Sequence, residues 1–301
     1  MTTTTSMPNF IDCEQGSELW AASRCGLVTA SRCADMLAKI KKGVSASRSK
    51  YRAELVIEIL TGQPYPQYVS QEMQWGTDQE PFGRAAYEMQ QDVLVETCGF
   101  VLHPTLPRFG ASPDGLVGED GMIQVKCPNT STHLNCMLSG VVPVEYAPQM
   151  LAEMACAGRQ WSDFVSFDPR LPKHLQLFVR RLERDQKLIV ALEAEVVKFT
   201  AEVDDVLAKL PQPEAGQPVV AVLDQDLVDE PELESAPAPV IDRSAEFMPK
   251  PKIDDVDRKT GKPKFANYGE YELAKDDWLQ QDTIRQIREM LNLVMGTQKV
   301  Q

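Results

Sequence analysis

Apolar positions with helical spacing alternate with short β-rich runs along the first part of the chain. The helical spacing predicts helices over residues 49–61, 144–157 and 184–210. Residues 93–101 and 108–117 are rich in the β-branched and aromatic residues that favour strands. This alternation predicts an α/β (α+β) core in which helices flank a mixed central sheet.

Local signals predict where two further helices begin. A helix over residues 32–40 would be capped by Thr29 or Ser31, whose hydroxyl oxygens suit the first free N–H groups of a helix. A second helix is expected over residues 73–91. Pro81 requires that this helix either starts or kinks there, because proline lacks the N–H of the helical ladder.

Composition divides the chain into three parts. Residues 1–210 carry the alternating pattern and form the predicted core. Residues 211–251 are rich in Pro, Ala, Glu and Asp, which indicates a flexible, self-repelling acidic linker. Residues 252–301 regain helical spacing and are expected to form a C-terminal helical interaction element. Its apolar face, around Trp278 and Leu291, would dock on a partner or pack back on the core.

The charge and the cysteines of the chain bear on its partners, on metal binding and on its location. The formal net charge of -13 looks unsuited to a polyanionic partner, but much of it lies in the acidic linker, so the core is free to gather basic residues. The seven cysteines contain no CxxC pair, which favours reduced thiols and argues against a zinc site. No stretch approaches the ~18 apolar residues of a membrane helix, and no secretory signal opens the sequence, so we expect a cytoplasmic protein.

A predicted hairpin carries the chemistry of the chain. The sequence GEDG at residues 118–121 indicates a tight turn, which brings Asp114 beside Gln124 on adjoining strands or their ends. Lys126 projects from the same strand face as Gln124, because side chains alternate along a strand. Oxygen ligands of this kind suit Mg²⁺, which activates water and neutralises charge on phosphorus. Lys126 would orient that water or stabilise the oxyanion, so the pattern predicts phosphodiester cleavage.

The sequence lacks the motifs of several other classes of enzyme. His103, His133 and His174 are isolated from serine or cysteine partners at recognisable spacing, and we expect them to be surface or structural residues. No GxxxxGK(S/T) loop is present, so the sequence does not support an ATP-driven enzyme. The GxSxG and HExxH motifs of other hydrolases are absent as well.

Four segments, in this order, carry a resemblance to a known family. LWAASRCGLVTASRCADML, MQWGTDQEPFGRAAYE, FGASPDGLVGEDGMIQVKCP and YAPQMLAEMACAG resemble motifs of the lambda-exonuclease (YqaJ-like viral recombinase) family. That family lies within the PD-(D/E)xK nuclease superfamily. The resemblance covers about residues 14–184 and implies a restriction-endonuclease-like core.

The resemblance implies a role for each residue that matches a motif. Asp114 would be the central metal ligand, Gln124 the second ligand, and Val125 a ligand through its backbone carbonyl. Lys126 would be the catalytic lysine. Glu80 would hold a metal-bound water or a second metal.

A further set of matches concerns the substrate. Gln149 would touch the attacking water or the scissile phosphate. Arg24, Ser31 and Ser112 match the family's pocket for a terminal 5′-phosphate, a chemistry that a planar guanidinium and two hydroxyls suit. Trp20 would stack on a base or on the DNA end, or would be a partly buried core residue.

The activity implied by the resemblance is 5′ to 3′ resection of linear duplex DNA from 5′-phosphorylated ends. It would require Mg²⁺ or Mn²⁺. A toroidal homotrimer would thread the DNA, and the exposed strand would pass to a single-strand annealing protein during phage recombination in the cytoplasm of a bacterial host. We expect the C-terminal element to tether that partner.

Gln124 departs from the family pattern, which usually has glutamate at this position. A neutral amide oxygen still ligates Mg²⁺, but one negative charge is lost, so metal affinity should fall. Three explanations remain: a natural active variant, an inactivating substitution made for study, and a natural non-cleaving protein that binds DNA ends. A structure-specific endonuclease is a further alternative, since it would share the hairpin but not the 5′-phosphate pocket.

Overall fold

The computed structural model describes residues 9–38, 44–211 and 285. The predicted acidic linker (211–251) and C-terminal element (252–301) lie outside the described residues, apart from residues 211 and 285. Their predicted roles therefore stay predictions. None of the described helices has both the length and the apolar run that a membrane span needs.

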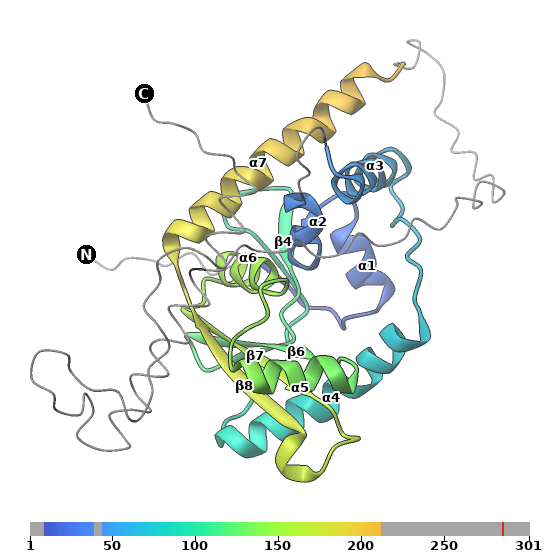
Figure 1. Cartoon of the computed structure of the whole chain (residues 1–301). Coiled ribbons are helices and arrows are strands. Elements are labelled where there is room, and N and C mark those ends of the chain that lie inside the picture. The colour runs from blue at the N-terminus through green and yellow to red at the C-terminus, as the bar shows by residue number, and fades with distance from the viewer. Residues whose placement is uncertain (1–8, 39–43, 212–284, 286–301) are drawn as a thin grey trace, which may run out of the picture.

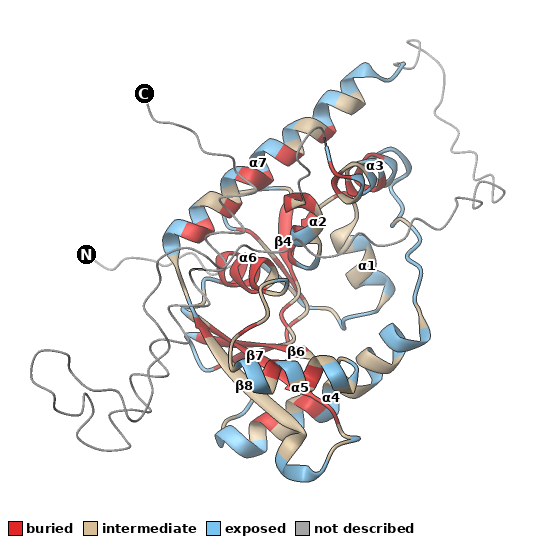
Figure 2. Cartoon of the chain, viewed as in Figure 1, coloured by how far each residue is buried: buried red, intermediate tan, exposed pale blue. Residues whose placement is uncertain are grey.

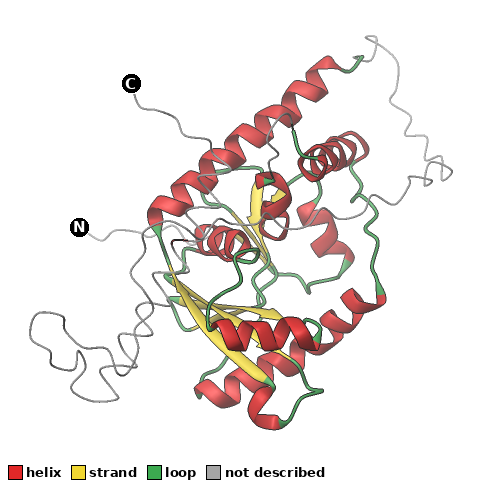
Figure 3. Ribbon diagram, in the orientation of Figure 1, coloured by secondary structure: helices red, strands yellow, loops and turns green. Residues whose placement is uncertain are grey.

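The strands of the described residues, eight in all, form two mixed sheets rather than one. Figure 3 shows these strands in yellow. The first sheet has the order β1-β3-β4-β2 and the second β5-β6-β7-β8. Pairs β2–β4 and β6–β7 are parallel and the other pairs are antiparallel. The strands are β1 (Asn9–Ile11), β2 (Val28–Thr29), β3 (Phe100–Leu102), β4 (Phe109–Ala111), β5 (Gly115–Val117), β6 (Gly121–Lys126), β7 (Trp161–Phe167) and β8 (Leu177–Glu183).

Helices flank both sheets, and α6 lies at the centre of the molecule (Figure 1). Helix α4 packs on one face of the second sheet, whereas α5 and α6 contact the opposite face. Helix α6 also packs against the first sheet and α7, and all of its residues except Gln149 are buried (Figure 2). The helices are α1 (Glu18–Arg24), α2 (Cys33–Leu37), α3 (Ala46–Thr61), α4 (Gln71–Gln91), α5 (Thr130–Ser139), α6 (Ala147–Ala157) and α7 (Gln186–Lys209). The predicted α+β class is confirmed.

Strand β6 is buried on both faces, and its side chains divide between two cores. Ile123 and Val125 pack with Tyr87 of α4 in a small apolar cluster. Met122, on the other face, belongs to the main core that includes most of α6. Because side chains alternate along a strand, Gln124 is turned toward α6. The apolar residues of β6 thereby set the direction of its polar ones.

Two predicted strands differ from the observed ones. Of residues 93–101, only the end enters a strand, β3, while Val93 and Val95 pack on the apolar cluster from a loop. Their hydrophobicity reflects packing, which pattern alone does not separate from strand formation. The predicted strand 108–117 divides into β4 and β5, which belong to different sheets. Pro113 lies between them and has no N–H to donate to a ladder.

Two predicted helix starts lie close to the observed ones. Helix α4 begins at Gln71, where Ser70 Oγ accepts the Met73 N–H, and Pro81 lies inside the helix rather than at its start. Thr29 is the N-cap residue of a short 3-10 helix (Ala30–Arg32) that leads into α2, but its side chain makes no capping hydrogen bond. The hydroxyls of Thr29 and Ser31 instead lie 3.5 Å from each other. They are therefore available to the pocket described below.

Close packing of α4 on β6 depends on Gly83. A Cβ at Gly83 would lie 2.9 Å from Val125 Cγ1 and 3.1 Å from Phe167 Cβ. We expect Gly83→Ala to lower the free energy of unfolding by about 1–3 kcal/mol, because the added methyl overpacks the interface. Urea unfolding measures this loss.

Gly76 provides the matched control on the same helix. A Cβ there would meet only the Cys127 carbonyl oxygen, at 3.7 Å, which is ordinary contact. Gly76→Ala should therefore raise the free energy of unfolding by up to about 1 kcal/mol through helix propensity. Equal destabilisation by both substitutions would contradict this account of the interface.

Candidate active site

A pocket of about 930 Å³ gathers nearly all of the predicted site residues. It is lined by residues of α1, α4, β6 and α6 and by the segment that joins β4 to β5. Val125 is the exception, because its side chain is buried against α4. The predicted residues that line the pocket are Trp20, Arg24, Ser31, Glu80, Ser112, Asp114, Gln124, Lys126 and Gln149.

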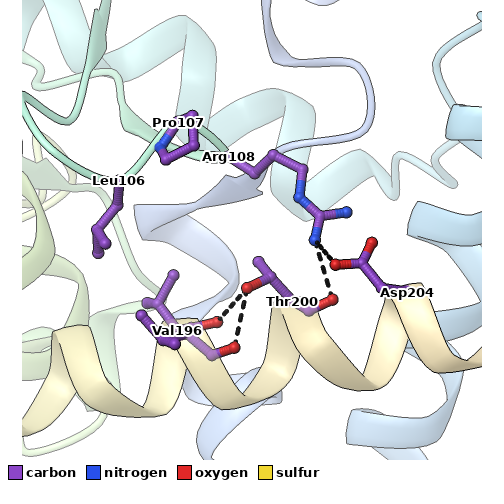
Figure 4. Close-up of a pocket in the computed structure, with 7 residues that line it drawn as sticks. Leu106, Pro107, Arg108, Val196, Thr200 and Asp204 are labelled. Carbon is purple, nitrogen blue, oxygen red and sulfur yellow. Dashed lines mark hydrogen bonds and ion pairs between the residues drawn. The ribbon is translucent and has the colours of Figure 1, made fainter.

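A second pocket, of about 520 Å³, lies beside α7 (Figure 4). The main polar groups of this pocket already form hydrogen bonds within the protein. Arg108 Nη2 donates to the Thr200 carbonyl at 3.0 Å and to Asp204 Oδ2 at 2.7 Å. Thr200 Oγ1 donates to backbone carbonyls of α7. The larger pocket is therefore the candidate site.

Asp114 lies directly before β5, at the open end of the β5–β6 hairpin. Gly115 pairs with Ile123 in this hairpin, which places Asp114 opposite Gln124. Asp114 Oδ2 accepts a hydrogen bond from the Val125 N–H at 2.7 Å and another from Gln124 Nε2. The structure thus brings Asp114 and Gln124 together, as the predicted hairpin requires.

Gln149 joins the hairpin to helix α6. Its Nε2 donates to Gln124 Oε1 at 2.8 Å and to Glu153 Oε1 at 2.8 Å. Gln149 and Glu153 are four residues apart and therefore lie on one face of the helix. A continuous chain of hydrogen bonds runs from Asp114 through two amides to the Glu153 carboxyl group.

Lys126 and Glu80 complete the predicted centre. The Lys126 ammonium is 5.7 Å from the centre of the Tyr146 ring and its positive charge acts on the Asp114 and Glu80 carboxyls. Glu80 comes from α4, as does Arg84 one turn later, and both line the pocket. The charge of Arg84 also acts on Asp114 and Glu80.

Arg84 and Glu153 are two further residues of the pocket that were not predicted from the sequence. Each follows a predicted site residue by four positions, Glu80 in one case and Gln149 in the other, so helical spacing was the signal that could have found them. Both line the pocket. They add a guanidinium group and a carboxyl group to the predicted centre.

The three carboxyl groups of the pocket share one electrostatic environment. Burial raises the pKa of Asp114, although the Lys126 ammonium and the hydrogen bonds to Asp114 act in the opposite direction. Burial, reinforced by the negative charge of Asp114, raises the pKa of Glu80 to about 7. The same two causes raise the pKa of Glu153 well above its ordinary range. The folded protein therefore favours protonation at this centre.

The residues matched to a terminal phosphate lie together in the same pocket. Arg24 Nη2 donates to Ser31 Oγ at 3.5 Å, and Trp20 Nε1 donates to Ser112 Oγ at 2.8 Å. The Arg24 guanidinium lies 3.7 Å from the centre of the Trp20 ring. Arg24 therefore covers one face of the indole, and Trp20 holds it by a cation–π contact.

Any metal ion in this centre would need more than acidic side chains. Within the described part of the chain, no three His, Cys, Asp or Glu side chains lie close enough together to hold a metal ion. The predicted donors also include the Gln124 amide oxygen and the Val125 backbone carbonyl. All of these are hard oxygen donors, which suit Mg²⁺ or Mn²⁺ and not zinc. The seven cysteines are free thiols.

Comparison with known proteins shows clear similarity. The YqaJ-like viral recombinase domain matches residues 19–160. The crystal structure of LHK-Exo, an alkaline exonuclease from Laribacter hongkongensis, is 47% identical with a TM-score of 0.60, and the match covers 64% of this chain and 95% of that one. LHK-Exo in complex with dAMP gives the same values. A phage-related exonuclease from Haemophilus somnus 129PT is 14% identical, with a TM-score of 0.48 and coverage of 60% and 95%. No curated protein matches the chain.

The raised pKa of Glu80 predicts a pH dependence of stability. Its carboxyl binds a proton more tightly in the folded protein, with a pKa of about 7 against an ordinary value of 4.5. The Glu80 carboxyl group therefore makes its full contribution to the stability of the folded protein below pH 4.5, where it is protonated. This contribution is lost as the pH rises to about 7. Without divalent metal, we expect Glu80→Gln to gain thermal stability over the parent as the pH rises through this window.

Thermal unfolding in EDTA between about pH 5 and about pH 8 measures this difference. Asp78→Asn, on the same helix and exposed, is the control and should follow the parent at every pH. A difference between Glu80→Gln and the parent that does not change with pH would contradict the account.

Proposed function

The chain belongs to the YqaJ-like viral recombinase domain family, and from this premise we propose that it is a metal-dependent exonuclease that degrades linear duplex DNA from 5′-phosphorylated ends. The family supports action on DNA by an exonuclease. The 5′ to 3′ direction, the requirement for Mg²⁺ or Mn²⁺, and a role in recombination by strand annealing are our proposals for this chain.

One observation carries the proposal. The acidic centre around Asp114 and the group formed by Arg24, Ser31 and Ser112 line the same pocket. The first group suits cleavage of a phosphodiester, and the second offers a guanidinium and two hydroxyls to a phosphate. A strand whose terminal phosphate is held at Arg24 would present a nearby phosphodiester to the acidic centre. Anchoring by the terminus would make the enzyme an exonuclease.

The residues of the pocket fit a hard divalent cation. Asp114, Gln124 and Glu80 would hold it with side-chain oxygens, and Val125 with its carbonyl. Burial and mutual repulsion raise the pKa values of the carboxyl groups. A cation among them would offset this repulsion and favour their charged forms. When bound, Mg²⁺ would supply a more acidic water and would neutralise charge that develops on phosphorus.

The chain's own side chains would position the substrate. Lys126 would orient the attacking water or stabilise the oxyanion, since its ammonium lines the pocket close to Asp114. Gln149 would contact the water or the scissile phosphate. The Arg24–Trp20 contact favours a role for Trp20 in holding the guanidinium, because one face of the ring is already covered.

A non-cleaving protein that binds DNA ends is the second candidate, and Gln124 is the observation that favours it. In the observed arrangement the Gln124 amide donates to Asp114, so it brings no negative charge to the centre. The same pocket would then hold the terminal phosphate without cleavage. The structure-specific endonuclease remains the third candidate.

The proposed function also implies an assembly and a protein partner. We propose a homotrimer around duplex DNA and a single-strand annealing protein as partner, bound through the region beyond residue 211. The expected location is the cytoplasm of a bacterial host.

Digestion of DNA tests the proposed function. The parent should degrade 5′-phosphorylated linear duplex with Mg²⁺ or Mn²⁺, and EDTA should stop the reaction. Lys126→Ala should lower the rate by about 100-fold or more, because it removes a charge that stabilises the transition state. Gln124→Glu should equal or exceed the parent. Lys50→Ala, at an exposed lysine on α3, is the control and should keep full activity.

The same assay separates the alternatives. Cleavage of covalently closed circular DNA as fast as linear DNA would establish an endonuclease and defeat the proposal. A parent that does not cleave, beside a Gln124→Glu variant that does, would show an inactivated centre.

A further inference from the structure

Helix α6 carries a buried carboxylate that the family motifs do not explain. Glu153 is 0% exposed and lies one turn after Gln149, among small and apolar neighbours such as Ala152, Met154 and Ala155. An isolated buried carboxylate destabilises a fold unless it is paired or protonated. The position of Glu153 therefore calls for a proton or a compensating cation.

The other buried carboxylates of the described chain each have a cationic partner. Glu54, Asp163, Asp168 and Glu195 form ion pairs with an arginine or a lysine, at 2.7 or 2.8 Å. Glu153 has no such ion pair among the described residues. It receives one hydrogen bond at Oε1, whereas its buried Oε2 has no hydrogen-bond partner in the described part of the chain.

Glu153 belongs to the same pocket as the predicted site residues. Its charge interacts with those of Asp114 and Lys126. Gln149 Nε2 donates both to Gln124 Oε1 and to Glu153 Oε1, each at 2.8 Å. The two oxygens are therefore no farther apart than two hydrogen-bond lengths. A carboxylate thus lies within side-chain reach of the position where the family usually has one.

We propose that Glu153 is a metal-ligating carboxylate of this centre and that it supplies, from helix α6, the negative charge that Gln124 lacks on strand β6. The inference rests on the proposed metal-dependent function. Gln124 would keep its place by hydrogen bonds to Asp114 and Gln149. Asp114 and Glu153 would then be the two carboxylates that share the cation, and the charge that the family usually has on the strand would come from the helix.

Binding of Mn²⁺, measured by isothermal titration calorimetry without DNA, tests the inference independently of cleavage. Glu153→Gln keeps the size and the Gln149 contact but removes the charge, and it should weaken Mn²⁺ affinity by about tenfold or more. Gln124→Glu combined with Glu153→Gln returns the charge to the strand. This double variant should recover affinity to within about threefold of the parent.

Controls distinguish a ligand from a merely structural glutamate. Glu195→Gln replaces another buried glutamate, on α7, and should leave Mn²⁺ affinity unchanged. If Glu153 is only a protonated structural group, Glu153→Gln will bind Mn²⁺ as tightly as the parent, and the inference is overturned. Failure of the double variant to recover affinity, while it keeps the parent's unfolding temperature, would overturn it too.

Asp114→Asn separates this inference from the proposed function. Loss of Mn²⁺ binding in Asp114→Asn, with parent affinity in Glu153→Gln, would reject Glu153 as a ligand and leave the metal centre intact. Parent affinity in Asp114→Asn, or no binding by the parent, would reject the centre itself and the inference with it.

Discussion

Burial of strand β6 between two helices is the constraint on which the site depends. Ile123 and Val125 must face α4 to fill the apolar cluster around Tyr87, and the absence of a side chain at Gly83 lets that helix approach. Alternation along the strand then turns Gln124 toward α6. A shift of one residue in register would bury polar groups and expose apolar ones. The same packing that stabilises the core thus fixes the direction in which Gln124 and Lys126 point.

This arrangement concentrates acidic groups in one pocket, which lowers the stability of the fold. Asp114, Glu80 and Glu153 line one pocket, and burial raises the pKa of each. Lys126 and Arg84 offset part of the repulsion between Asp114 and Glu80. A divalent cation would offset the rest, which explains why such a centre would persist in a nuclease at a cost in stability.

Local features of the site could be predicted from the sequence, whereas features built by distant segments could not. The turn at residues 118–121 lies within a few residues of the strands it joins, so the pairing of Asp114 with Gln124 followed from turn chemistry. The division of 108–117 between two sheets depends on pairing with β2, far away in the chain. Glu153 lies inside the segment YAPQMLAEMACAG, but the sequence gave it no role, because its burial beside β6 shows only in the structure. The family motifs located the centre, but its charge required the three-dimensional arrangement.

If Asp114 organises a divalent-metal centre whose charge comes partly from helix α6, both carboxylates must bind one cation. Anomalous diffraction from a crystal soaked in Mn²⁺ locates that cation. We expect a peak within about 2.0–2.6 Å of carboxylate oxygens of both Asp114 and Glu153. A peak bound by Asp114 and Gln124 with Glu153 turned away, or no peak in this pocket, would contradict this expectation.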